Sequence, residues 1–239
     1  MAEAFFWGAL AQSTLVIGAV IAVLRPLSRR LLGLVMAFGA GVLLSAVSFE
    51  LISRAVTTAD GLRGTTLGFF AGALVFTVGD ALIVRHESGP GAAEAEAGLP
   101  IVLGALLDGI PESAVLGLTL LQDGRISAAM LVAVIISNLP EGIAATVALR
   151  AAGWTTTRII VLWSVVVAAG GLAAAVGYAL LDDASPYVLA FVLAFAAGAI
   201  LTMLATSMMP QAFMNAGRNV GVVTVAGFAL ALAVNWLQG

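Results

Sequence analysis

The sequence contains no cysteine, no lysine and a single histidine, and only 10% of its 239 residues are charged. The absence of cysteine excludes disulfides, thiolate metal sites and cysteine nucleophiles. So few charges cannot supply the solvated surface of an ordinary soluble domain. The chain is instead apolar, with 62% hydrophobic residues and a mean hydropathy of +1.12. This composition is typical of an integral membrane protein.

Eight apolar stretches are long enough to cross a bilayer, because a hydrocarbon core of about 30 Å needs about 20 helical residues. They cover residues 5–24, 31–52, 66–84, 99–121, 126–149, 159–181, 187–209 and 220–236. Short connectors rich in Arg, Asp, Gly and Pro separate them, and no second domain fits. We therefore expect an all-α membrane protein with one transmembrane domain over residues 1–239.

The distribution of arginine predicts the orientation of these spans. Seven arginines fall on the side of connectors 1–2, 3–4, 5–6 and 7–8, and three fall on the other side. The larger group is Arg25, Arg29, Arg30, Arg85, Arg150, Arg158 and Arg218, and the smaller is Arg54, Arg63 and Arg125. Because basic loops stay in the cytoplasm, we expect both termini outside. The longest connector, RHESGPGAAEAEAG, is then a cytoplasmic, low-complexity linker, and its His86 is expected to be solvated rather than metal-bound.

Spans 2 and 7 share a pattern that suggests an internal repeat. AFGAGVLLSAVSFELI and AFAAGAILTMLATSMM align without a gap from Ala37 and Ala194. The two spans run in opposite directions, so a true repeat has inverted topology, with three helices on each side of spans 4 and 5. Such repeats are typical of secondary transporters. The alternative is that close packing alone selects Gly and Ala on both helices.

Polar motifs interrupt spans 4 and 5. Span 4 contains DGIPES and span 5 contains SNLPEG, and in each a polar residue precedes a Pro-Glu pair. On a helix Asp108 and Glu112 share one face, as do Asn138 and Glu141. The prolines remove backbone donors, which frees carbonyl oxygens and kinks the helices. We expect the four side chains to converge near the middle of the membrane as an oxygen-rich cation site.

Placing the acids of these motifs in a membrane costs free energy. Each uncompensated acid at the bilayer centre costs about 2.5 to 3.5 kcal/mol, whereas a whole protein is stable by only about 5 to 15 kcal/mol. Neither span contains Arg or His to neutralise Asp108, Glu112 and Glu141. They must be protonated, face water or hold a cation. The alternative to a cation site is that protonated carboxyls join the helices as structural contacts.

Further polar residues are candidates for an ion pathway. Glu50 has Arg54 one turn later, which predicts a helix-end ion pair, with an outer-mouth cation attractor as the alternative. Asp80 either extends to the membrane interface or lines an exit path. Ser137, Ser207 and Gln211 complete this candidate set.

The span order and the paired Pro-Glu motifs resemble the ZIP family of divalent metal transporters, whose members typically carry His-Asn-x-Pro-Glu-Gly on span 4 and x-x-x-Pro-Glu-Gly on span 5. The resemblance implies that Asp108 stands at the histidine, Glu112 and Glu141 at the glutamates, and Asn138 at a ligand position. The TSMMPQ stretch of span 7 is similar to His-Glu-x-x-Pro-Glu. Thr206, Ser207 and Gln211 there replace the family's polar ligands and acids.

The resemblance implies a transporter that admits a divalent metal such as Zn²⁺, Mn²⁺ or Fe²⁺ to the cytoplasm, in the plasma membrane of a bacterium. The metal is then the substrate, and we expect no cofactor, enzymatic activity or nucleic acid partner. All the ligands are oxygens, which suit harder cations such as Mn²⁺ better than imidazole does. Gly/Ala-rich faces are compatible with a homodimer.

The alternatives to a divalent metal transporter are a monovalent cation or proton pathway, and a non-transporting homologue that acts as membrane partner or metal sensor.

Overall fold

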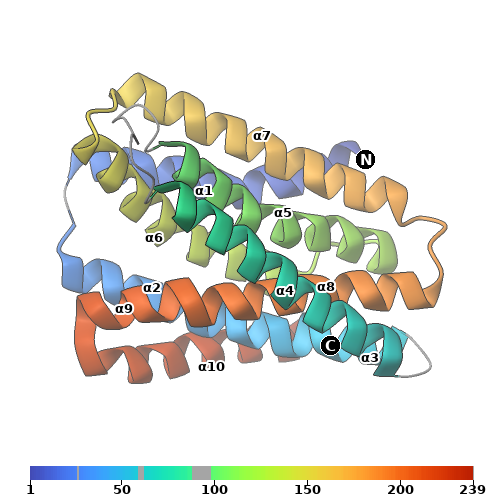
Figure 1. The fold of residues 1–239 in the computed structure, drawn as a ribbon. Helices are drawn as coiled ribbons and strands as arrows, with labels where there is room; N and C mark the ends of the chain where they lie inside the picture. Colours follow the sequence, from blue (N-terminus) through green and yellow to red (C-terminus); the bar gives the residue numbers. More distant parts are fainter. Residues whose placement is uncertain (26, 59–61, 88–97, 239) are drawn as a thin grey trace.

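The computed structural model describes residues 1–25, 27–58, 62–87 and 98–238, and every regular element in these ranges is a helix (Figure 1). Two short segments, η1 and η2, are π-helical, and η3 is a 3₁₀ turn. In chain order the elements are α1 (Ala2–Leu24), α2 (Arg29–Ala46), η1 (Val47–Ile52), α3 (Ser53–Thr58), α4 (Leu62–Glu87), α5 (Gly98–Asp123), α6 (Ala128–Ala151), α7 (Thr156–Leu180), α8 (Pro186–Met203), η2 (Leu204–Met208), α9 (Met209–Ala216), η3 (Gly217–Asn219) and α10 (Val220–Gln238).

Within the described residues, seven helical stretches are long and apolar enough to cross a membrane. The chain is therefore an all-α protein of the membrane class, as the composition predicts. The last stretch, Pro186–Leu237, has 52 residues, which at 1.5 Å per residue would be about 78 Å long if it were straight. It is not straight, because Gly217 has φ 65, a left-handed conformation that glycine adopts without strain. The chain reverses there, and α10 runs back beside α2 (Figure 1).

Four of the helices, α2, α6, α7 and α8, begin at a hydroxyl cap. The side chains of these residues accept a hydrogen bond from the backbone N–H three residues later, which satisfies one of the free donors of the first turn. The caps are Ser28, Ser127, Thr155 and Ser185. The hydroxyl residues in the connectors therefore fix where the membrane helices start.

The helices around the second connector extend beyond the predicted apolar stretches. The helical run that begins at Arg29 continues to Thr58 rather than ending at residue 52, and α4 begins at Leu62 rather than at 66. Hydropathy marks where apolar residues stop, whereas a helix continues as long as its polar side chains find partners. Here the hydroxyl of Thr57 donates to the Ser53 carbonyl at 3.0 Å, and Arg54 is ion-paired. Residues 88–97 of the predicted linker, and the side chain of His86, lie outside the described part.

The helices form two groups that are held together internally by glycines. In one group α2 packs on α10 and α4 packs on α8; in the other α1 packs on α6 and α7, and α5 packs on α7. A Cβ added to Gly41 would lie 1.9 Å from the Thr224 carbonyl oxygen, and one added to Gly142 would lie 2.5 Å from that of Leu15. Backbones therefore touch without intervening side chains, as in other membrane helix pairs.

Candidate functional site

A cavity of about 350 Å³ lies between α2, α5, α6 and the α8–η2–α9 run. Its polar lining residues all belong to the set that the sequence singles out: Asp108, Ser137, Glu141, Ser207 and Gln211. The remaining lining residues are small or apolar, among them Met36, Gly104, Ala105, Ala144, Ala145, Ala148, Met203 and Met208. Helices that are distant in the sequence thus present two carboxylates, two hydroxyls and an amide to one space.

Asp108 and Glu141 occupy equivalent depths in the bundle. Asp108 lies ten residues after the first residue of α5, and Glu141 lies ten residues before the last residue of α6. The start of α5 and the end of α6 lie at the same end of the bundle (Figure 1). At 1.5 Å per residue both acids are about 15 Å from that end, which is half the thickness of a hydrocarbon core. Both side chains are half-buried and line the same cavity. Two ionised carboxylates in one cavity repel each other, and a cation between them would relieve this repulsion.

Glu112 is the most deeply buried of the motif acids. Its side chain is on α5, one turn after Asp108, and the residue is 1% exposed. Its Oε2 has no hydrogen-bond partner among the described residues, and Glu112 is not in the lining of the cavity. The Glu112 carboxyl nevertheless interacts electrostatically with the carboxyls of Asp108 and Glu141. A buried carboxylate oxygen without a partner is unfavourable unless a proton or a cation neutralises it.

Asn138, the fourth predicted ligand, is oriented toward α1. The residue is 2% exposed, and its Nδ2 donates to Oε1 of Gln12 at 3.1 Å. The Nε2 of Gln12 in turn donates to the Gly109 carbonyl at 3.3 Å and to Oγ of Ser113 at 3.2 Å. Sequence reasoning missed Gln12, although an amide within the predicted span that contains AFFWGALAQSTLVIG is itself a signal.

The described residues contain no group of three or more His, Cys, Asp or Glu side chains arranged to hold a metal ion. The carboxylates that share the cavity are the pair Asp108 and Glu141. A cation at this place would therefore draw on two carboxylates and on the hydroxyl and amide oxygens beside them. Oxygen atoms of these kinds bind hard cations and also relay protons.

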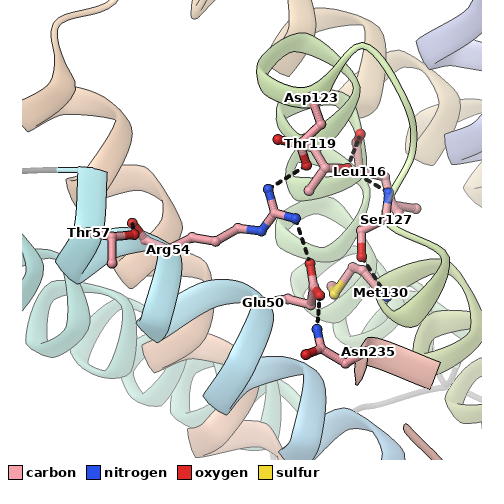
Figure 2. Close-up of polar contacts among 9 residues, drawn as sticks. All are labelled: Glu50, Arg54, Thr57, Leu116, Thr119, Asp123, Ser127, Met130 and Asn235. Carbon is pink, nitrogen blue, oxygen red and sulfur yellow. Dashed lines mark hydrogen bonds and ion pairs between the residues drawn. The ribbon is translucent and has the colours of Figure 1, made fainter. Parts of the chain in front are cut away.

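A second polar cluster lies at the end of the bundle where α5 ends, and Figure 2 shows its contacts. The guanidinium of Arg54 lies 3.1 Å from Oε2 of Glu50 and 2.5 Å from Oδ2 of Asp123. Asn235 donates from Nδ2 to the other carboxylate oxygen of Glu50. The ion pair predicted between Glu50 and Arg54 is confirmed, and the contacts to Asp123 and Asn235 add α5 and α10 to it. With Arg125, these side chains line a polar pocket of about 550 Å³.

The two remaining candidates differ in their surroundings. Asp80 is half-buried on α4, and its charge acts on Asp108. Thr206 is exposed on η2, and its hydroxyl donates to the Thr202 carbonyl of the same helix at 2.9 Å. Asp80 therefore belongs to the electrostatic surroundings of the cavity, whereas the Thr206 side chain is bonded within its own helix.

Comparison with known proteins gives no relative: no protein-family model matches the chain, and no curated protein matches its sequence. The function must therefore be inferred from the helices, the cavity and the polar side chains themselves.

Proposed function

We propose that this protein is a ZIP-like transporter that moves a divalent metal ion across the membrane, with Asp108 and Glu141 at the centre of its cation site. The observation that carries this proposal is the cavity in which the two carboxylates meet at equal depth, beside Ser137, Ser207 and Gln211. Acids are kept in the middle of membrane proteins where they serve ion pathways.

We propose eight crossings rather than seven. The 52-residue run would contain two of them, α8–η2–α9 and α10, with the turn at Gly217 between them. A straight helix of that length would exceed the bilayer by more than a factor of two. An even number of crossings returns the C-terminus to the side of the N-terminus.

An inverted repeat is the second part of the proposal, and helices α2 and α8 support it. Both have 18 residues, both follow a serine cap, and their first residues are separated by the same interval as Ala37 and Ala194. The π-helical segments begin at Val47 and Leu204, again at that interval. Compositional likeness between packed helices does not explain a coincidence of caps and π turns.

Glycine contacts extend the correspondence to α4 and α10. A Cβ on Gly41 would meet the Thr224 carbonyl and the Phe228 nitrogen, and one on Gly198 would meet the Phe69 carbonyl and the Ala73 nitrogen. Phe69 and Thr224 are separated by the same interval as Ala73 and Phe228. The contact of α2 with α10 thus has the same construction as that of α8 with α4. Inverted repeats of this kind support a transporter.

The arginines support an orientation with both termini outside, in the plasma membrane of a bacterium. The α1–α2, α6–α7 and α9–α10 connections lie at one end of the bundle, and the α3–α4 and α7–α8 connections lie at the other (Figure 1). The first end carries Arg25, Arg29, Arg30, Arg150, Arg158 and Arg218. Under the positive-inside rule it is cytoplasmic. The cavity lies in this half of the bundle, so the structure would represent a state in which the site is reached from the cytoplasm.

The polar side chains that line the cavity offer oxygen ligands, which favour a hard ion. We propose that Glu112 and Asn138 complete the ligand set when the ion is bound, and that Mn²⁺ competes better here than at an imidazole site.

A proton or monovalent cation pathway is the second candidate. It is favoured by the unpartnered Oε2 of Glu112, which lies one turn after Asp108 on α5, because neighbouring buried acids can relay protons. The proposal includes no enzymatic activity and no bound cofactor.

Uptake into liposomes tests the proposal directly. Purified protein is reconstituted, and uptake of Mn²⁺, Zn²⁺ and Fe²⁺ is compared with that of Na⁺, K⁺ and protons. We expect divalent uptake that is abolished in Glu141→Gln and Glu112→Gln, because each substitution removes a negative charge and preserves the shape of the side chain. Both variants are expected to fold, as judged by their elution in detergent and their melting temperatures.

The matched control is Asp182→Asn, which removes a carboxylate of the exposed α7–α8 turn. It should transport like the unmodified protein. Divalent uptake by Glu141→Gln at the unmodified rate contradicts the metal site. Uptake of protons or Na⁺ without divalent uptake supports the second candidate instead.

A further inference from the structure

We propose that Gln12 is a positioning residue of the cation site: its amide ties the polar motifs of α5 and α6 to α1 and fixes the orientation of the Asn138 amide. This inference rests on the proposed function, since it assigns Gln12 a role at that same site. Gln12 is 1% exposed and is not among the residues that line the 350 Å³ cavity. Its role is therefore exerted through the residues that it holds.

One amide group contacts both motifs. Nε2 of Gln12 donates to the Gly109 carbonyl at 3.3 Å and to Oγ of Ser113 at 3.2 Å, and both acceptors belong to DGIPES. Oε1 of Gln12 accepts from Nδ2 of Asn138 at 3.1 Å, and Asn138 belongs to SNLPEG. Gly109 and Ser113 directly follow the two acids of α5, and Asn138 lies one turn before Glu141. Gln12 thus spans the helices at the level of the carboxylates.

Glycines make the room that this side chain occupies. A Cβ on Gly170 of α7 would lie 2.4 Å from Cγ of Gln12, and a Cβ on Gly109 would lie 2.9 Å from its Nε2. Nearby, a Cβ on Gly18 would lie 2.5 Å from the Leu139 carbonyl, so the α1 backbone rests directly on the motif of α6. The amide is therefore held in a slot formed by three helices and has little freedom to turn.

The bonding pattern determines which atom of Asn138 can bind a cation. Nδ2 of Asn138 directs its protons at Oε1 of Gln12 and at the Ala11 carbonyl, 3.5 Å away. The carbonyl Oδ1 is then the end of the amide that remains for a metal. Partners that orient a metal ligand typically change the affinity by about 10- to 100-fold. Glutamine suits this position because it donates to α5 and accepts from α6 with one planar group.

Gln12→Met tests this role, because methionine keeps the length of the side chain and removes every hydrogen bond. With Mn²⁺ as the probe in liposome uptake, we expect KM to rise by about 10- to 100-fold while the rate at saturating Mn²⁺ falls less. The double variant Gln12→Met with Asn138→Ala should have the KM of Asn138→Ala alone, since both changes act through one amide. Multiplied effects, or an unchanged KM in Gln12→Met, overturn the inference.

The control for lost stability is Thr146→Val. Thr146 of α6 is fully buried and accepts a hydrogen bond from Nε1 of Trp163 at 3.0 Å, so this variant also loses a buried interhelical bond. It should lower the melting temperature and leave KM unchanged. A KM raised as much in Thr146→Val as in Gln12→Met shows a merely structural effect and overturns the inference.

A second measurement separates this inference from the proposed function. The side-chain amide of Asn138 is followed by nitrogen-15 NMR in detergent, without metal. We expect Gln12→Met to shift this signal and to speed its hydrogen exchange, whereas Thr146→Val leaves it in place. An unchanged signal in Gln12→Met overturns the inference whatever the protein transports. If the signal shifts but the protein takes up no ion, the result supports the hydrogen bond between Gln12 and Asn138 and overturns only the proposed function.

Discussion

Arg54 and Asp123 are 69 residues apart in the sequence, yet Nη1 of Arg54 lies 2.5 Å from Oδ2 of Asp123. This contact joins α3, which packs on α8, to α5 of the other helix group. It lies at the end of the bundle opposite the cavity, where Arg54 also neutralises Glu50 (Figure 2). In the proposed orientation this cluster lies on the outer side, and the carboxylates of the cavity lie in the cytoplasmic half.

Removal of Arg54 should be more damaging than removal of Asp123. The Glu50 side chain is 5% exposed, so Arg54→Gln leaves a buried carboxylate without its cation and should destabilise the protein by about 1 to 3 kcal/mol. Asp123 is 33% exposed, and Asp123→Asn should cost about 0 to 1 kcal/mol. Unfolding in detergent measures both. Glu50→Gln in the Arg54→Gln background should recover stability, and a larger loss in Asp123→Asn would refute this ranking.

Asp108→His should change the metal preference. Asp108 and Glu141 face the same cavity, so a histidine at 108 adds an imidazole and removes one negative charge. Imidazole suits zinc and its neighbours, whereas carboxylates suit Mn²⁺. We expect the ratio of Zn²⁺ to Mn²⁺ uptake to rise by about tenfold, equivalent to about 1.4 kcal/mol in relative binding. The ratio is measured at fixed pH, and an unchanged value argues against Asp108 as a ligand.

Gly41→Ala and Gly198→Ala should destabilise the protein to similar extents. Their added Cβ atoms would lie 1.9 Å and 2.0 Å from backbone carbonyls, so the helices must separate. Overpacking of this kind costs about 1 to 3 kcal/mol. Gly221→Ala is the control, because a Cβ there meets nothing within 4 Å and alanine favours a helix. Thermal unfolding distinguishes them, and a large difference between Gly41→Ala and Gly198→Ala weakens the repeat.

The proposed orientation predicts which positions react from each side of the membrane. The chain lacks cysteine, so each introduced thiol is the sole target of a membrane-impermeant reagent. Asp182→Cys, in the α7–α8 turn, should be labelled on intact cells. Thr157→Cys, at the start of α7, should be labelled only in inverted vesicles. The opposite result reverses the orientation and, with it, the direction from which the cavity is reached.

Sequence alone predicts the helical membrane class and the polar residues of the cavity, because both depend on local rules. An acid in an apolar span is recognised from the sequence alone, as Asp108 and Glu141 are. The network around Gln12 depends on which helices meet, and no periodicity reveals that α1 lies against both motifs. The extension of the second helix to Thr58 was missed for a related reason: it is stabilised by contacts of Arg54 with residues far along the chain.

The outcome for Asn138 shows the same limit. Its spacing from Glu141 predicts a shared helix face, yet its amide is bonded to α1, and Glu141 faces the cavity. A spacing of three residues leaves an angular difference of about 60°, which is enough for two side chains to face different neighbours in a tightly packed bundle. Only the position of the third helix determines which neighbour each side chain meets.

The paired π turns at Val47 and Leu204 also bear on how such a chain could have arisen. A π turn holds one more residue than an α-helical turn, and such turns are rare and are found mostly at functional positions. If the two halves descend from one ancestral segment, the extra residue was already present before that segment was duplicated. The π turn would then be older than the fused protein.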